Sequence, residues 1–374
     1  LAADYTPGEA DQLRRDMAAW GAENRIEAHH ARIVERMAAR GIEREFAERV
    51  FAQIRGFGEY GFPESHAASF ALLSYATAWL RCHHPSVFLC ALLNAQPMGF
   101  YQPATLVDDA RRRGVVVRPI SVLQSAWDCT LEGMIEGVIA PPVRMGLRYV
   151  TGLGVVERER IEAAWRDGPF TDLEDFTRRT ALPTRQLVRL AQAGAFDDFG
   201  LERRDAIWAA RALARFRHDT LPLASAATQL HFASLDGAER ISWDYRASRH
   251  STAGHPISRL RPHLTQQGLP SACELSALPH GKRVDYVGLV ICRQRPGTAS
   301  GVTFFTLEDE TGFVNAVLYR DAFERQRTLA KTSVLLGMSG VLQVVDGVTH
   351  LLVQKLFAPR LPVLEELPRS RDFH

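Results

Sequence analysis

The sequence lacks the features that would place it in a membrane or outside the cell. No stretch of ~18 residues, the length that begins to span a bilayer, is uninterruptedly apolar, and no basic segment followed by an apolar one opens the chain. The cysteines are odd in number and scattered, so they do not form a disulfide framework. They are Cys82, Cys90, Cys129, Cys273 and Cys292. These absences predict a cytoplasmic protein with reduced thiols and no membrane partner.

Lysine is nearly absent. Lys282, Lys331 and Lys355 are the only lysines among 45 basic residues, and arginine supplies the rest. Arginine suits bidentate contacts with phosphate, but a GC-rich genome produces the same bias and explains it better. The formal net charge of +2 is too small to predict nucleic-acid binding by itself.

The length of 374 residues predicts two or three separate cores, and the 46% of apolar residues suffices to fill them. Up to about residue 122, apolar residues recur at the three- and four-residue spacing of helices. The core faces of two helices that break at Gly41 are indicated by Ile33, Met37, Ile42, Phe46, Val50, Phe51 and Ile54. Ser65 then caps a long helix expected over residues 66–84, whose apolar residues cover more than one face and predict burial in the middle of its domain.

A second helical region follows the two prolines at 141 and 142. It contains a short hairpin at residues 150–154, a helix over 155–165 and a further helical pair around 187–195. From about 218 to 280 the composition turns to Ala, Ser, His and Pro with weak periodicity, which is typical of a linker or a loosely packed segment.

Beyond Arg283 the hydrophobic period changes to two, which indicates strands. The expected elements are strands over 284–292, 302–306 and 313–317, a helix over 321–329, and strands over 333–345 and 349–357. This is the order of the five-stranded OB barrel. The predicted fold class is therefore multidomain α+β, with all-α regions followed by an all-β OB barrel.

The hairpin carries the first candidate binding site. Gly152, Leu153 and Gly154 form a tight turn before a helix start, where backbone N–H groups attract a phosphate. The arrangement resembles a helix-hairpin-helix element, which holds duplex DNA by its backbone. An ordinary helix–helix turn is the alternative, and Arg158 and Arg160 on the next turn favour DNA.

The barrel region offers aromatic residues of the kind on which unpaired bases stack. They are Tyr286, Phe304, Phe305, Phe313 and Tyr319. Because Phe304 and Phe305 are neighbours on one strand, they face opposite ways, so at least one belongs to the core. Nucleic-acid binding is the favoured role of this barrel, and protein contact is the alternative.

Three further residues look unremarkable in isolation. Arg14 and Arg15 would lie on a solvated helix face, and His66 in a capping turn. They stand, however, in the stretches YTPGEADQLRR (5–15) and YGFPESH (60–66), which are accompanied by QPMGFY (96–101) and GHPI (254–257). With these motifs the whole chain resembles the carboxy-terminal half of bacterial C-family DNA polymerases, and most of all the error-prone DnaE-type group (ImuC).

The resemblance implies a division into partial fingers (1–122), a tandem helix-hairpin-helix region (123–215), a connecting segment (216–280), an OB domain (281–360) and a tail (361–374). It further implies that Arg14 and Arg15 approach the incoming nucleoside triphosphate and that His66 lines the same site. Replicative relatives carry Lys where this chain has Glu64, an acid that would weaken phosphate attraction.

Polymerisation by two metal ions requires carboxylates that hold both ions. The family has an Asp-x-Asp pair in its palm domain, but no Asp-x-Asp occurs in this sequence. We therefore expect no catalytic residue and no metal ligand in this chain, and Mg²⁺ held by palm residues outside it. The clamp-binding peptide of replicative relatives is shortened here to QLHF (229–232). This predicts indirect clamp recruitment, through an accessory Y-family-like protein (ImuB).

The sequence thus predicts the carboxy-terminal part of an error-prone DNA-directed DNA polymerase in damage-induced translesion synthesis. The complete enzyme would add dNTPs to the 3′ end of a primer on primer–template DNA, and the part present here would be inactive alone. The alternative is a truncated, stand-alone DNA-binding protein without catalytic activity.

Overall fold

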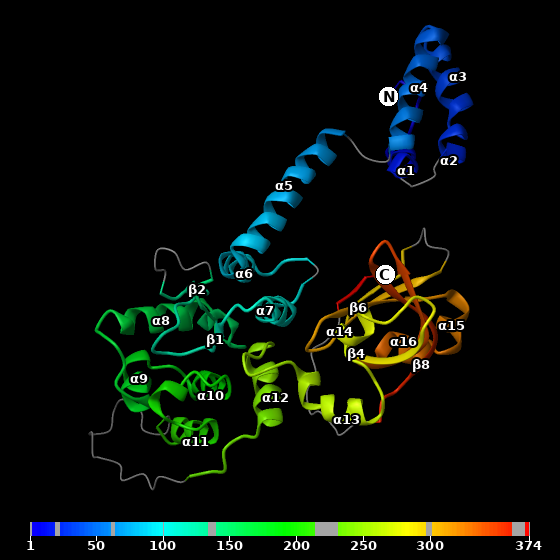
Figure 1. Cartoon of the computed structure of the whole chain (residues 1–374). Coiled ribbons are helices and arrows are strands. Elements are labelled where there is room, and N and C mark those ends of the chain that lie inside the picture. Colours follow the sequence, from blue (N-terminus) through cyan, green and yellow to red (C-terminus); the bar gives the residue numbers. More distant parts are fainter. Residues whose placement is uncertain are drawn as a thin grey trace. The chain divides into compact units, whose positions relative to one another are not determined.

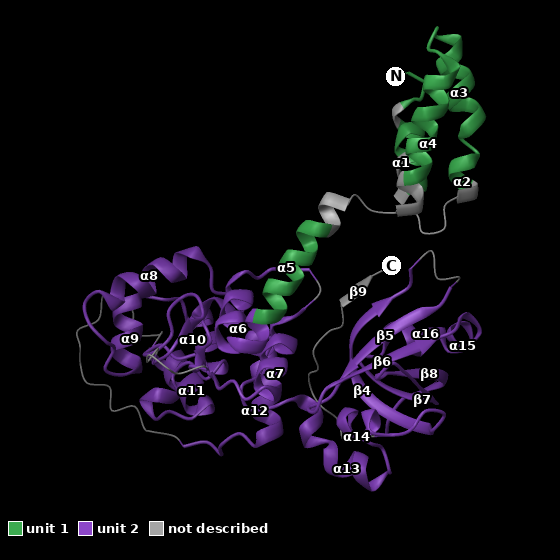
Figure 2. Ribbon diagram, turned by 45° about the horizontal axis from the view of Figure 1, so that its top comes forward, with its two compact units in different colours: residues 1–79 green, residues 80–374 purple. Residues whose placement is uncertain are grey.

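The computed structural model describes residues 2–18, 23–60, 64–99, 101–133, 140–213, 231–296, 301–360 and 371–373. The chain divides into two compact units, residues 1–79 and 80–374 (Figures 1 and 2). Each unit is described by itself.

The first unit is helical. Its helices are α1 (Pro7–Ala18), α2 (Glu23–Glu27), α3 (His30–Ala39), α4 (Arg44–Tyr60) and the beginning of α5 (Glu64–His83). Ile26, Ile33, Met37 and Phe51 are buried in one core, the last three as the helical spacing predicts. Phe46, also expected in this core, is 48% exposed. Gly41 has φ +80° between α3 and α4, a left-handed conformation that favours glycine and ends the helical path there.

The long helix α5 differs from the expectation. Its side chains from residue 68 to 80 are exposed, and Leu72 and Tyr75 are each 74% exposed. The burial inferred from its all-round apolar character is therefore wrong for the described chain. Among the described residues, no helix is both long and apolar enough to cross a bilayer.

The second unit begins with a larger helical part. Its elements are α6 (Pro85–Asn94), α7 (Pro103–Arg112), β1 (Val117–Arg118), β2 (Thr130–Leu131), β3 (Val143–Arg144), η1 (Leu147–Tyr149), α8 (Val155–Trp165), α9 (Leu173–Thr180), α10 (Thr184–Gln192), η2 (Asp197–Phe199) and α11 (Arg203–Leu213). A row of edge-to-face rings joins Phe170, Phe176 and Phe196 at centroid distances of 4.8 and 5.3 Å. Leu89 and Leu93 of α6 belong to the same core, so α6 packs with the segments that follow it.

The expected linker is ordered and packed over residues 231–280. It forms α12 (Gly237–Ser248), η3 (Pro256–Arg259), α13 (Arg261–Gln266) and α14 (Ala272–Ser276). Ile257 and Leu264 are fully buried, and Ser271 caps α14 by accepting the N–H of Glu274. α13 and α14, with six and five residues, are too short to produce a clear sequence period. α12 has twelve residues, and the prediction of a loosely packed segment is wrong for it as well.

The predicted barrel is confirmed. Strands β4 (Arg283–Gln294), β5 (Thr303–Glu308), β6 (Phe313–Leu318), β7 (Leu335–Val345) and β8 (Val348–Phe357) follow the expected order, with α15 (Arg320–Arg325) and α16 (Arg327–Thr332) in place of one helix. The sheet order is β5-β6-β8-β7-β4, and β4 also pairs with β5, which closes the barrel. In the predicted tail, β9 (Arg371–Phe373) pairs in parallel with the end of β4. The fold is thus helical with a closed, OB-like five-stranded barrel.

Candidate nucleic-acid interface

The turn between η1 and α8 has the shape required of a tight hairpin. Gly152 has φ +94°, which a residue with a Cβ adopts only under strain. Gly152 and Gly154 are exposed, whereas Leu153 is half-buried against the core and anchors the turn. The N–H of Thr151 donates to the carbonyl of Ala247 on α12 at 2.7 Å, so the hairpin is also held from the connecting segment.

The N-terminus of α8 presents free backbone donors beside this hairpin. Val155 and Val156 are 68% and 57% exposed. Within the described chain no acceptor contacts their N–H groups, as is usual in the first turn of a helix. The N–H of Gly154, by contrast, donates to Glu157 Oε2 at 2.8 Å. Two of the three amides expected to face a phosphate are therefore available, and one is occupied by a carboxylate.

The two arginines near the hairpin differ in their contacts. Arg158 is exposed and pairs with Glu162 one turn later at 2.8 Å, on the solvent side of α8. Arg160 donates to the carbonyl of Ala181 at 2.7 Å. Arg158 is therefore the one of the pair placed to reach a ligand, while Arg160 joins α8 to the next turn.

That next turn joins α9 to α10. The family resemblance implied a second hairpin in this region but did not mark its residues. Ala181 lies in the left-handed region with φ +47°, and Pro183 precedes the first residue of α10. The turn contains no glycine, so the signal that marked the first hairpin is missing. Gln186 Nε2 lies 3.3 Å from Glu157 Oε1, which links the start of α10 to the start of α8.

On the barrel, the alternation of β5 separates the two neighbouring phenylalanines. Phe305 is 1% exposed in the barrel core, whereas Phe304 is 40% exposed. Phe305 is therefore the core member that the alternation required, and it is removed from the candidate DNA contacts because its ring is covered inside the barrel. Tyr286 is likewise fully buried.

Exposed aromatic rings gather around β5 and β6. Phe313 is 37% and Tyr319 is 55% exposed. Phe304 pairs in register with Val317, and Phe313 pairs with Glu308 at the other end of the same two strands. The guanidinium of Arg112 lies 4.7 Å from the ring centroid of Phe313. These rings form a partly exposed aromatic surface of the kind that stacks with bases.

In the first unit, only one predicted nucleotide contact is described at the level of its side chain. Arg15 is exposed on α1 and donates to Asp11 one turn earlier at 2.9 Å. Arg14 and His66 lie on α1 and α5, but their side chains are outside the described residues. Thr6 and Glu9 of the same motif lie at the start of α1. The hydrogen bond from Arg32 to Glu9, and next those from Thr6, lower the pKa of Glu9 to about 2.

The acidic run Glu308-Asp309-Glu310 lies at the end of β5 and in the turn that follows it. Asp309 is fully buried and accepts hydrogen bonds from Thr311, Gly312, Ala272 and Arg261. It therefore fixes the β5–β6 turn, the start of α14 and the start of α13 at one point.

Comparison with known proteins shows which proteins this chain is similar to. Residues 114–206 match the family described as "Helix-hairpin-helix motif". Over its whole length the chain is 47% identical to the error-prone DNA polymerase of Burkholderia mallei and 45% identical to that of Pseudomonas paraeruginosa. The chain is a homologue of error-prone DNA polymerases.

The match covers all of this chain but only part of each relative. The chain spans 35% of the Burkholderia protein and 36% of the Pseudomonas protein, about a third of the length of these relatives. The resemblance predicted from the motifs is thus confirmed over every part of this chain. A solved asparaginyl-tRNA synthetase from Pyrococcus horikoshii matches 24% of the chain with a TM-score of 0.21, which is too low to inform the fold.

Proposed function

We propose that this chain is the part of an error-prone DNA polymerase that holds primer–template DNA during damage-induced translesion synthesis. The main support is the exposed N-terminus of α8, which follows the Gly152–Gly154 hairpin and lies within the segment that matches the helix-hairpin-helix family. The homology to error-prone DNA polymerases supports the assignment to synthesis rather than to DNA binding alone.

The hairpin contacts the backbone of the duplex. The N–H groups of Val155 and Val156 and the positive end of the α8 dipole bind a phosphate, and Arg158 pairs with a neighbouring phosphate. These groups carry no base-reading donors, so the contact is independent of sequence. Such independence suits an enzyme that must follow any template.

The barrel meets the single-stranded template. Phe304 supplies a ring on which a base stacks, and Phe313 a second one backed by Arg112. Phe305 has no part in this contact because it is buried.

Nucleotide binding belongs to the complete polymerase. Arg14, Arg15 and His66 are proposed to contact the incoming dNTP, since guanidinium groups neutralise the charge of its phosphates. Mg²⁺ would supply the two-metal chemistry of phosphoryl transfer.

The described residues do not fit that metal pair. Mg²⁺ prefers an octahedron of oxygen ligands. In the described part of the chain, the only group of three or more His, Cys, Asp or Glu side chains close enough to hold an ion contains His255 and is buried among arginines. We therefore propose that palm residues outside this chain hold the catalytic Mg²⁺, and that the chain alone does not extend a primer.

Clamp recruitment is proposed to be indirect, through an accessory Y-family-like protein such as ImuB. In the shortened peptide, Phe232 packs against Trp208 at a centroid distance of 6.1 Å, and its N–H donates to Asp205 at 2.9 Å. A phenylalanine engaged on α11 is not presented to a pocket on the clamp. Gln229 and Leu230 lie outside the described residues.

The proposal is tested by fluorescence anisotropy of the purified chain with a primer–template carrying a 5′ overhang. Binding should fall steeply between ~50 and ~200 mM salt, and Arg158→Ala should lower the slope of log K against log salt by about one. Arg166→Ala, at the opposite exposed end of α8, is the matched control and should leave the slope unchanged. Salt-insensitive binding, or equal effects of the two variants, would contradict the duplex contact.

A further inference from the structure

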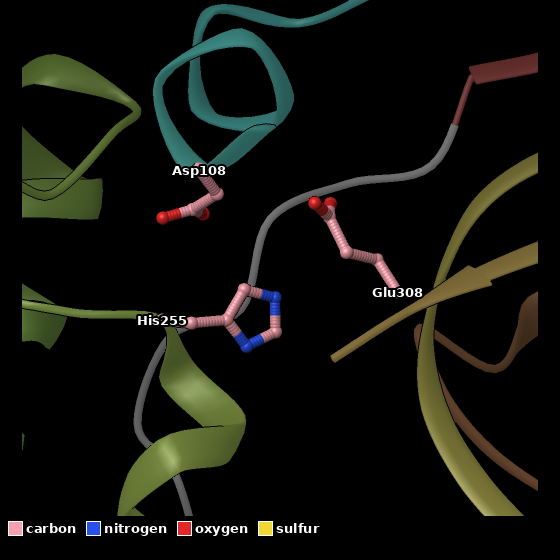
Figure 3. Close-up of side chains that lie close together, drawn as sticks. All are labelled: Asp108, His255 and Glu308. Atoms are coloured by element: carbon pink, nitrogen blue, oxygen red, sulfur yellow. The ribbon is translucent and has the colours of Figure 1, made fainter. Parts of the chain in front are cut away.

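A buried cluster joins the helical part of the second unit to the barrel. Asp108 on α7, His255 just before η3 and Glu308 at the end of β5 are only 6%, 4% and 2% exposed. One polar atom from each lies within 4.8 Å of the other two. Figure 3 shows the two carboxyl groups and the imidazole ring converging from three separate elements.

The two carboxyl groups differ in their hydrogen bonds. Glu308 Oε1 accepts from Arg112 at 2.9 Å, and its Oε2 lies 3.4 Å from the Thr105 hydroxyl. The nearest cation to Asp108 is Arg111 at 3.8 Å, beyond hydrogen-bond distance, and no described residue donates a hydrogen bond to its carboxyl group. Asp108 is thus a buried acid that lacks the partners an ionised carboxylate needs.

The tautomer of His255 argues against a bound cation here. Its Nδ1 accepts the N–H of Ile257 at 3.2 Å, so a neutral ring carries its proton on Nε2. The ring nitrogen on the other side faces the two carboxyl groups (Figure 3). A protonated Nε2 donates a hydrogen bond and cannot coordinate a metal ion.

We propose that Asp108, His255 and Glu308 form a proton-retaining junction between α7 and the barrel, in which the two carboxyl groups keep one proton at neutral pH. The retained proton neutralises one carboxyl group, so that two negative charges are not buried together beside the neutral ring of His255. The junction then needs no metal ion and no additional cation to be satisfied.

The local electrostatics support one retained proton. Burial, and next the charge of Asp108, raises the pKa of Glu308, against the effect of Arg112. Burial raises the pKa of Asp108, against Arg111 and Arg112. Burial, and then Arg112, Arg261 and Arg111, lowers the pKa of His255 to about 3, so the ring is neutral.

The other charged or titratable groups around the junction come from every element packed on it. They are Arg111 and Arg112 on α7, Asp244 and Tyr245 on α12, Arg261 on α13, and Asp309 and Glu310 after β5. Arg261 is taken by Asp309 and Glu310, and Arg112 by Glu308. Arg111 lies 3.8 Å from Asp108, and neither it nor Arg112 donates a hydrogen bond to that carboxyl group.

The sign of the pH effect follows from linkage. The folded chain holds a proton that the unfolded chain releases near the ordinary carboxyl pKa, so stability is greatest below that value. It is lost progressively as pH rises toward the raised pKa at which the folded pair gives up its retained proton. One retained proton changes the unfolding equilibrium tenfold per pH unit in this window.

The experiment compares thermal and urea unfolding of the whole chain and of Asp108→Asn from pH 5.5 to 8.5. The amide imitates a protonated carboxyl group, and Glu308 keeps Arg112. We expect Asp108→Asn to match the parent at low pH, to exceed its Tm at pH 8, and to lose the tenfold-per-unit slope. Infrared difference spectra should show a protonated carboxyl band in the parent that is missing in the variant.

The control is Asp244→Asn, another buried carboxyl group, which binds Arg203 at 2.7 Å and Ser251 at 2.6 Å. Its replacement breaks an ion pair, so stability should fall without removing the slope. Parallel pH profiles of the parent and Asp108→Asn would overturn the proposal. So would a rise in Tm on adding Zn²⁺ or Mn²⁺ to the parent but not to Asp108→Asn, because the junction would then be a cation site.

Discussion

Placing a negative charge at the hairpin separates DNA binding from folding. Val155 is the first residue of α8 and is 68% exposed, so Val155→Glu meets no steric obstacle. A carboxylate in the first turn of a helix stabilises it by about 0.3–1 kcal/mol through the helix dipole. The same carboxylate stands beside the proposed phosphate, so affinity for DNA should fall while stability stays level or rises.

The size of the loss follows from Coulomb's law. Two unit charges ~6 Å apart repel by about 0.7 kcal/mol in water and by about 2.8 kcal/mol at an effective dielectric constant of ~20. Affinity for a duplex should therefore fall between ~3-fold and ~100-fold, and more at low salt.

The assay is duplex binding by anisotropy, together with thermal unfolding of the same samples. Val87→Glu is the matched control, since Val87 is also an exposed valine in the first turn of a helix, α6. Unchanged duplex affinity in a folded Val155→Glu protein, or an equal loss in Val87→Glu, would refute the placement of DNA at this hairpin.

Three further predictions concern the barrel and the packing around it. Phe304→Ala should weaken single-stranded DNA binding by about 1–3 kcal/mol in anisotropy titrations. Phe305→Ala should instead lower the free energy of unfolding by about 3–5 kcal/mol in urea. An equally large loss of stability in Phe304→Ala would show that Phe304 belongs to the core and does not stack on DNA. Asp309→Ala should lose about 3–5 kcal/mol, because the backbone N–H groups of Ala272, Thr311 and Gly312 lose their buried acceptor and Arg261 keeps only Glu310. A loss under ~1 kcal/mol would contradict this reading. Gly146→Ala would place its Cβ 2.4 Å from the carbonyl oxygen of Trp127, so it should destabilise by at least ~1–3 kcal/mol, and wild-type Tm would show that the backbone there yields easily.

Regular, strongly patterned segments could be predicted from the sequence. The helix expected at 155–165 coincides with α8, and the change of period near Arg283 marks the start of β4. The alternation at Phe304 and Phe305 already required opposite faces, although only the barrel's closure decided which of them is inside. The connecting segment was misjudged, since helices of five or six residues bury one or two side chains and leave no period to detect.

The residues of the candidate site divide in the same way. The turn at Gly152 and Gly154 could be found because a glycine pair before a helix is a local signal. A second hairpin was implied by the family resemblance, but its place at Ala181 could not be read from the residues, because a left-handed alanine leaves no mark in the sequence. The exposure of α5 could not be predicted either, since a pattern specifies an apolar surface but not what covers it.

What the sequence determined by itself is therefore local: where helices and strands lie, which turn can meet a phosphate, and which family of polymerases the motifs resemble. The tertiary structure alone decided what happens between distant segments. Asp108, His255 and Glu308 are far apart in the chain, and nothing in their own neighbourhoods marks them as a group. They meet only because α7, η3 and β5 pack together, and burial then changes the chemistry of the two carboxyl groups.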